Sequence, residues 1–345
     1  MELGIYTRYT ELGASSRLRC YRYADTLREC GFDVRMHPLF GDDTLQALYA
    51  GRGRRFKMAR DLVSRMFALP RAEKDLWIEY ELLPGIPYGV EKRYLKKRRY
   101  VLSFDDAVYL NYRGKKRLAD KFERLAAGAA GVMAANDLLV EHFSRFNANT
   151  VKIPTAVDTD ALRPGAEKFT CFTVVWIGTP VTFKAHFAPF APMFSALSHE
   201  LGFELLLIGA PDTAKRLLPY ARIEAWSEKT ERDLLPRCHA GIMPLPADDA
   251  FAAGKSAYKL LQYLAAGIPS IASPVGENRV VVRPGGTGFL AASPAEWKQA
   301  FQALIADETL RAELAAASRT EAEKYSVRRY APVIAKFFEK SFSGA

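Results

Sequence analysis

Short apolar runs alternate along the chain with segments whose apolar residues recur at helical spacing. The apolar runs are bounded by Gly, Pro and polar turns, as buried strands are. They read ELGIYTRY, FDVRMHPL, DLWIEYELLP and RYVLSFDDAVY in the first half, and FTVVWIG, FELLLIG and AGIMPLP in the second. Helical spacing occurs near residues 17–30, 115–127, 228–236 and 294–305. Such alternation of strand and helix predicts an α/β protein with parallel, doubly wound sheets.

A polar stretch divides these elements into two series. TAVDTDALRPG (155–165) contains Pro and Gly, and a new strand follows it. A chain of 345 residues suits two domains of ordinary size. We therefore predict one domain over residues 1–160, a second over 161–325, and a C-terminal amphipathic helix over 326–345.

The stretch from Ala253 to Leu290 combines a loop, a helix start and a buried strand. Gly254 and Lys255 lead to Ser256, a residue type that caps helices, and the helix is expected to end at Gly267. A helix N-terminus presents free N–H groups and a partial positive charge, which Lys255 and Lys259 reinforce. The pattern predicts a site for an anion, most simply a phosphate.

KLLQYLAAGIPSIASPVG, followed by GGTGFL, resembles the signature of the retaining glycosyltransferases of family 4, also called group 1. The likeness extends over nearly the whole chain. It implies a GT-B fold, in which two Rossmann-like domains face a cleft and a C-terminal helix crosses back to the first. It also implies that the second domain binds a nucleotide-sugar donor, and that no metal or other cofactor is required.

The resemblance implies donor-binding roles for two loops and two helix starts. The residues concerned are Gly13, Ala14, Ser15, Thr179, Lys184, Lys255, Ser256, Lys259 and Gln262. Simpler explanations stay open, because any doubly wound domain needs the first turn, Lys184 can be a solvated lysine, and Lys259 can extend along its helix. The family pattern has glutamates where this chain has Gly254, Gln262 and Val280.

Paired acids stand at the ends of two expected strands. Asp105 and Asp106 are the predicted catalytic residues, and Asp105 occupies the position of a family histidine. Paired carboxylates can orient an acceptor hydroxyl or share a proton, although they can also merely cap the next segment. Glu79, Glu81 and Arg17 are the predicted acceptor-binding residues. The spacing of the acids does not match a metal-binding DxD motif.

The net charge of +10 lies mainly in the first half, with 29 Lys+Arg and 21 Asp+Glu in residues 1–165. Solvated charge is the usual explanation, and no nucleic-acid-binding motif accompanies the basic runs. A basic amphipathic helix near residues 52–67 also suits an anionic membrane surface. Its basic residues are Arg52, Arg54, Arg55, Lys57, Arg60 and Arg65, and Phe56, Met66 and Phe67 are expected to insert.

Four scattered cysteines without a CxxC pair predict reduced thiols, and Leu125–Ala135, the longest nearly apolar run, is too short to span a bilayer. We expect a cytoplasmic protein, peripheral at the inner face of the plasma membrane. We predict a retaining, metal-independent hexosyltransferase that moves a sugar from a nucleotide-diphosphate donor to a hydroxyl acceptor. A lipid-linked glycan in envelope polysaccharide synthesis is the expected acceptor. The alternatives are a catalytically silent nucleotide-sugar or glycan-binding protein and a nucleotide-sugar epimerase.

Overall fold

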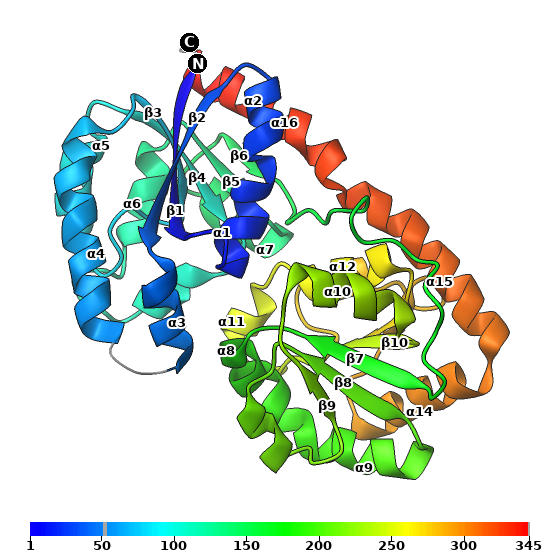
Figure 1. The fold of residues 1–345 in the computed structure, drawn as a ribbon. Helices are drawn as coiled ribbons and strands as arrows, with labels where there is room; N and C mark the ends of the chain where they lie inside the picture. Colours follow the sequence, from blue (N-terminus) through cyan, green and yellow to red (C-terminus); the bar gives the residue numbers. More distant parts are fainter. Residues whose placement is uncertain (51–53, 344–345) are drawn as a thin grey trace. The chain divides into compact units, whose positions relative to one another are not determined.

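A computed structural model describes residues 1–50 and 54–343, which form two compact units (Figure 1). Unit 1 comprises Met1–Ala156, the three residues Gly254–Ser256, and the chain from Val327 onward. Unit 2 comprises Val157–Ala253 and Ala257–Ser326. Within the described residues each unit contains a six-stranded parallel sheet, so the predicted α/β fold class with two Rossmann-like domains is confirmed.

The sheet of unit 1 has the order β2-β1-β3-β4-β5-β6. Its strands are β1 (Glu2–Tyr9), β2 (Asp33–Phe40), β3 (Asp75–Glu79), β4 (Arg99–Phe104), β5 (Gly131–Ala134) and β6 (Thr150–Lys152). Its helices are α1 (Ala14–Arg19), α2 (Ala24–Glu29), α3 (Asp42–Ala50), α4 (Arg54–Ala68), α5 (Tyr88–Leu95), α6 (Lys121–Gly128), α7 (Asp137–Ser144) and α16 (Val327–Phe342). Because the strands are parallel, the loops after β1, β3 and β4 meet at one edge of the sheet.

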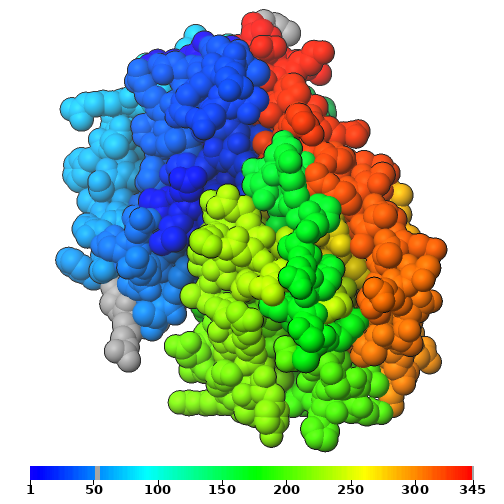
Figure 2. Space-filling view, turned by 45° about the vertical axis from the view of Figure 1, so that its right-hand side comes forward, coloured from blue at the N-terminus to red at the C-terminus, as the bar shows by residue number. Residues whose placement is uncertain are grey.

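Alternate strand residues of unit 1 pack into two separate cores, as the period of two requires. Leu76 and Ile78 face α4 to α7, whereas Trp77 faces α2 and α16. The C-terminal helix α16 returns to this face, where the rings of Phe338 and Trp77 lie 5.1 Å apart. Figure 2 shows α16 (red) lying against the N-terminal residues of the same unit (blue). The predicted C-terminal helix that crosses back to the first domain is therefore present.

The sheet of unit 2 has the order β12-β11-β10-β7-β8-β9. Its strands are β7 (Thr173–Ile177), β8 (Glu204–Ile208), β9 (Arg222–Glu224), β10 (Ala240–Met243), β11 (Ser270–Ala272) and β12 (Gly288–Leu290). Its helices are α8 (Pro180–Thr182), α9 (Ala191–Leu201), α10 (Glu228–Leu234), α11 (Ala250–Ala253), α12 (Tyr258–Ala266), α13 (Asn278–Val281), α14 (Pro294–Ala306) and α15 (Glu308–Ala322).

Close packing fixes α12 on the sheet of unit 2. Tyr263 is fully buried over Gly241 of β10, where a Cβ atom would come within 2.3 Å of the tyrosine ring. The Tyr263 hydroxyl donates a hydrogen bond to the carbonyl of Ile242 (3.2 Å) and accepts one from the amide of Ile177 (3.3 Å). The middle of α12 is thereby held against β7 and β10.

Several helix boundaries differ from the sequence prediction. The helix expected over residues 17–30 begins at Ala14 and is interrupted by a 3-10 turn at Tyr21–Tyr23. The helix expected at residue 115 begins at Lys121. Helix α15 was not predicted, because its alanine-rich sequence has only a weak apolar stripe.

Candidate functional site

The acids predicted at the strand ends of unit 1 lie together in the structure. Glu79 ends β3, pairs in register with Ser103 of β4, and is fully buried. Asp105 follows β4 and is also buried, whereas Asp106 is partly exposed. Burial, followed by the negative charges of Asp106 and Glu79, raises the pKa of Asp105 to about 7. Asp105 can therefore exchange a proton near neutral pH.

Tyr80, which directly follows Glu79 in the chain, adopts a backbone conformation that is rare for tyrosine. Its φ of +62° lies in the left-handed region, and its amide donates to the carbonyl of Ser103 (3.0 Å). This turn directs the Tyr80 hydroxyl to Oδ1 of Asp105, to which it donates a hydrogen bond. This conformation could not be predicted from the sequence, because a positive φ is common for glycine and rare for tyrosine.

The loop between β1 and α1 is connected to the strand-end acids through a hydrogen bond from Ser16 to Glu79. Helix α1 begins at Ala14, with Gly13 as N-cap and no side-chain cap. Serine is a residue type that caps helices, but the hydroxyl of Ser16 donates to Oε2 of Glu79 (2.5 Å) and accepts from the amide of Tyr9 (2.9 Å). The donor-binding role of Gly13, Ala14 and Ser15 stays a prediction.

Two of the predicted acceptor-binding residues are engaged within the protein. Glu79 Oε2 also accepts the backbone amide of Arg8 (2.7 Å). The guanidinium of Arg17 donates to the carbonyls of Glu11 (3.0 Å) and Leu12 (3.3 Å), which braces the turn before α1. Because Glu79 is fully buried, its direct contact is with the protein, and it acts on this site by fixing the end of β1.

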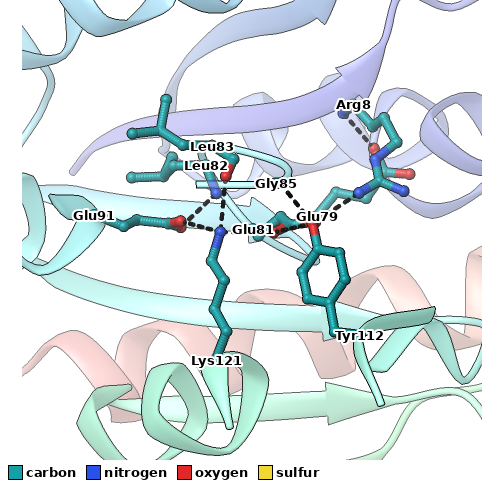
Figure 3. Close-up of polar contacts among 9 residues, drawn as sticks. All are labelled: Arg8, Glu79, Glu81, Leu82, Leu83, Gly85, Glu91, Tyr112 and Lys121. Carbon is teal, nitrogen blue, oxygen red and sulfur yellow. Dashed lines mark hydrogen bonds and ion pairs between the residues drawn. The ribbon is translucent and has the colours of Figure 1, made fainter. Parts of the chain in front are cut away.

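Glu81, the third predicted acceptor-binding residue, lies in a buried charge network (Figure 3). It accepts hydrogen bonds from Arg8 Nη2 (2.8 Å), Lys121 Nζ (2.7 Å) and the hydroxyl of Tyr112 (3.0 Å). Lys121 is also paired with Glu91 at 2.7 Å, and neither side chain is exposed. Sequence reasoning missed Arg8, Tyr112, Lys121 and Glu91, since their role depends on contacts over long sequence separations.

Lys255, a predicted donor-binding residue, contacts Asp106, a predicted catalytic residue. Gly254–Ser256 are grouped with unit 1, and Lys255 Nζ lies 3.3 Å from Oδ2 of Asp106. A side chain at position 254 would place its Cβ 2.4 Å from that of Ala107. The packing therefore requires glycine where the family pattern has its first glutamate.

Helix α12 begins one residue later than predicted. Its N-cap is Ala257, with a φ of +52°, so the expectation that Ser256 caps the helix is wrong. The reason is that the chain enters the helix through a left-handed residue, which leaves Ser256 outside the capping position. Lys259 lies in the first turn, with Nζ 5.6 Å from the centre of the Trp176 ring. Gln262 is buried on the same helix.

The second predicted donor segment follows β7. Thr179 caps the short helix α8 in a reciprocal pair with Thr182: the Thr182 amide donates to Thr179 Oγ1 (3.3 Å), and the Thr179 amide donates to Thr182 Oγ1 (2.9 Å). Thr179 therefore has a structural task beside its predicted donor role. Lys184 is exposed in the π-helical segment Phe183–Phe187, so its ammonium is accessible to a ligand.

The predicted basic amphipathic helix is α4, whose outer face is apolar. Phe56, Val63 and Phe67 are 80%, 50% and 77% exposed and recur at spacings of seven and four, which places them on one face. Two residues were assigned wrongly to the surface. Met66 packs on the core, and Arg65 is buried, where it donates to the carbonyl of Thr7 (3.1 Å). The prediction for Arg52 lies outside the described residues.

Other predicted features concern membranes, metals and thiols. Among the residues that the structure describes, no helix has the length and apolar character needed to cross a bilayer. The same residues contain no cluster of three or more His, Cys, Asp or Glu side chains arranged for a metal ion. Cys20 and Cys238 are buried thiols, and Cys30 and Cys171 are exposed ones.

Comparison with known proteins gives a family match and a fold. Residues 172–307 match the sequence model of the family described as Glycosyl transferases group 1. No curated protein sequence matches the chain. Sucrose-phosphate synthase from Thermosynechococcus elongatus superposes with a TM-score of 0.73 at 14% identity, over 100% of both chains.

Two further solved structures superpose on nearly the whole chain. A glycosyltransferase from Rickettsia africae has a TM-score of 0.70 at 11% identity, covering 100% of this chain and 99% of that one. Anabaena HepE in complex with UDP has a TM-score of 0.65 at 13% identity, covering 97% and 98%. The chain therefore has the GT-B fold, and its residues 172–307 carry the sequence pattern of group 1 glycosyltransferases.

Proposed function

We propose that the protein transfers a sugar from a nucleotide-diphosphate donor to a hydroxyl acceptor. The observation that carries the proposal is the group 1 match over residues 172–307, which spans α12 and the strand that follows it. Anabaena HepE, which shares the fold, has been crystallised with UDP and with UDP and glucose. These findings support a nucleotide-sugar donor bound by unit 2.

The donor diphosphate would be held by cations and backbone N–H groups. Lys259 stands in the first turn of α12 and Lys184 is exposed after β7, so both can approach a bound diphosphate. Positive groups fixed in place stabilise the negative charge that develops on the leaving diphosphate. We propose retaining transfer with these groups in the role that a metal ion plays in other transferases.

On the acceptor side, Asp105 and Asp106 would orient the attacking hydroxyl. A carboxyl group with a pKa of about 7 can accept the hydroxyl proton at neutral pH and release it afterwards. Asp106 remains partly exposed, as a group that contacts an acceptor must be. The bond between the sugar and the diphosphate breaks as the acceptor oxygen bonds to the sugar, and the hydroxyl proton passes to a base.

A lipid-linked glycan is the proposed acceptor, and α4 supports a membrane role. Its exposed face presents Phe56, Val63 and Phe67 to solvent, with Arg55 and Arg60 also exposed on the helix. Apolar side chains beside cations suit the interface of an anionic bilayer, where each well-placed Lys or Arg contributes about 1 kcal/mol. We propose peripheral association with the inner face of the plasma membrane through this helix.

A catalytically silent sugar-nucleotide binder is the second candidate. Gly254, Gln262 and Val280 replace the glutamates of the family pattern, and the packing against Ala107 excludes a side chain at position 254. Loss of these carboxylates would leave nucleotide binding possible while weakening the chemistry.

Two measurements separate the candidates. A thermal-shift screen with UDP, GDP, ADP, CDP and dTDP should identify one base, because ligand at 100 times its Kd adds about 2.7 kcal/mol to the unfolding free energy. Labelled sugar from the matching donor should then move to a glycan acceptor or to water. Binding without either reaction would favour the silent binder. Conversion of the free donor sugar to its epimer would indicate an epimerase, and no nucleotide binding at all would refute the proposal.

A further inference from the structure

We propose that a pocket within unit 1 binds one uncharged sugar ring of the acceptor; this inference rests on the proposed function. The pocket has a volume of about 210 Å³ and opens among the ends of β1 and β2, helices α3 and α4, and the 3-10 turn Val108–Tyr112. Its walls are mainly apolar and aromatic, formed by Tyr9, Phe40, Leu48, Met58, Val108 and Tyr112. All of these residues belong to unit 1.

The size of the pocket limits its occupant. Sites for drug-sized ligands have volumes of roughly 300–1,000 Å³. A pocket of about 210 Å³ accommodates one ring and excludes a longer oligosaccharide from its interior. The remainder of a larger acceptor would lie outside it.

Arg8 supplies hydrogen-bond donors at the polar side of the pocket. Its guanidinium lies over the Tyr80 ring, 5.0 Å from the centre, and is held by Glu81 through Nη2. Nε and Nη1 have no acceptor among the described residues, and the side chain remains 21% exposed. A guanidinium offers five N–H donors, so this fixed group can bind the oxygens of a ligand. Asn111, which is exposed, adds an amide at the rim.

Charge balance then favours a neutral ligand. Arg8 and Lys121 are offset by Glu81 and Glu91, whose contacts were described above. Glu79 adds a further buried carboxylate beside the backbone of Arg8. Of these charged residues only Arg8 and Glu81 line the pocket, and they offset each other, so a phosphate or carboxylate would meet no net positive charge in the lining to compensate for its lost hydration.

A ligand with oxygen atoms along its edge and C–H groups on its faces satisfies both sets of contacts. The oxygens would accept from Arg8 and Asn111, and the C–H faces would lie against the aromatic walls. An unphosphorylated pyranoside has this chemistry. The structure thus assigns the acceptor's sugar end, rather than a phosphorylated group, to the pocket.

Calorimetric titration of the full chain tests the assignment without any donor. The probes are phenyl β-glycosides of glucose, galactose, mannose and N-acetylglucosamine, with glucose 6-phosphate as the charged comparison. We expect at least one glycoside to bind at least tenfold more tightly than the phosphate. Leu48→Trp should fill the pocket and weaken that binding at least tenfold. Leu138→Trp, on α7 and outside the pocket, is the matched control and should bind like the wild type.

Equal or tighter binding of the phosphate, no glycoside binding to the wild type, or unchanged binding to a folded Leu48→Trp variant would overturn the inference. Met58→Trp, which fills the pocket from α4, replaces Leu48→Trp if that variant fails to fold. Failure of the proposed function is distinguishable. Glycoside binding in the pocket without nucleotide binding would refute sugar transfer and leave the pocket assigned. Sugar transfer with the same acceptor affinity in the wild type and in Leu48→Trp would refute the pocket and leave sugar transfer supported.

Discussion

The hydroxyl of Tyr80 donates a hydrogen bond to Asp105, and a left-handed backbone at Tyr80 makes this contact possible. A non-glycine residue in this region costs of order 1–3 kcal/mol, so the surrounding contacts must hold it. Arg8 over the tyrosine ring and the Tyr80 amide bond to Ser103 do so. The relationship matters because the hydrogen bond lowers the pKa of Asp105, against the larger effects of burial, Asp106 and Glu79 that raise it.

Tyr80→Phe should therefore raise the pKa of Asp105 above its value of about 7. A hydrogen bond to a charged group contributes about 1.5–3 kcal/mol, equivalent to about one to two pH units. If the ionised carboxylate is needed, the acid limb of the pH–rate profile should move to higher pH, with kcat at high pH nearly unchanged. Tyr109→Phe, also in unit 1, serves as the control. A uniform loss of activity without a shifted profile would contradict this role.

Asp105→Asn should reduce turnover by roughly 10²-fold or more while nucleotide affinity stays within about twofold, because a positioned acid or base supplies at least that factor. The pH dependence of stability gives an independent readout. A carboxyl group with a raised folded pKa destabilises the folded state as pH rises from its unfolded pKa, about 3.9, to about 7. The variant should thus gain in Tm relative to the wild type at pH 8 but not at pH 4.

The contrary outcome for Asp105→Asn is a collapse of nucleotide affinity with normal turnover at saturating donor. An equal change in Tm at both pH values would instead show that Asp105 is not a buried acid with a raised pKa.

Local sequence patterns were sufficient for most strands and for the strand-end acids. Asp105 and Asp106 follow an apolar run that can only be a buried strand, and parallel topology brings its end beside Glu79. The conformation of Tyr80 could not be predicted, because it is imposed by tertiary contacts against the preference of the residue. Likewise, Ser16 is a good capping residue by type, yet the nearby carboxylate of Glu79 competes for its hydroxyl.

The burial of the Lys121 ammonium could not be predicted from the sequence for a related reason. Lysine is rarely buried unless paired, and its partners Glu81 and Glu91 lie 40 and 30 positions earlier in the chain. Helix periodicity places Lys121 within the helix expected over residues 115–127, but it cannot say which charges contact the lysine. Contacts of this kind are set by the fold as a whole.

Lys121→Met should destabilise unit 1 by about 3–5 kcal/mol, the usual cost of removing one partner from a buried ion pair. Glu91 would then lose its paired cation, and Glu81 would keep only Arg8. Urea unfolding followed by tryptophan fluorescence measures the change. Lys116→Met, at an exposed position, is the matched control and should change stability by less than about 0.5 kcal/mol. Equal stability of the two variants would show that the network contributes nothing.

Lys255→Ala should weaken binding of the preferred nucleoside diphosphate by roughly 10- to 100-fold, since a charge-assisted contact contributes about 1.5–3 kcal/mol. The lysine already contacts a carboxylate, Asp106, at 3.3 Å, so its ammonium is placed to bind an anion. Calorimetry with the nucleotide found in the thermal-shift screen measures the loss. Lys229→Ala, whose side chain is 80% exposed on α10, should bind normally. Unchanged affinity in a folded Lys255→Ala protein would remove this residue from the phosphate site.

Membrane binding by α4 should require both its apolar face and its charge. Phe56 and Phe67 are among the most exposed apolar side chains of the described residues. Burial of each in a bilayer interface would therefore be favourable. We expect the protein to sediment with vesicles containing anionic lipid at low salt and not with neutral vesicles. Because the attraction is screened over about 10 Å at 0.1 M salt, binding should weaken as salt rises.

Two sets of substitutions separate these contributions. Phe56→Ser with Phe67→Ser should reduce sedimentation even at low salt, since charge alone would remain. Reversal of Arg54, Arg55 and Lys57 to Glu should abolish sedimentation, while nucleotide binding persists because none of the three is a proposed donor-binding residue. Leu217→Ser with Tyr220→Ser, which changes an exposed apolar pair of unit 2, is the matched control and should sediment like the wild type. If the wild type ignores anionic vesicles at low salt, α4 presents only a solvated face, and a soluble glycan becomes the better acceptor to test.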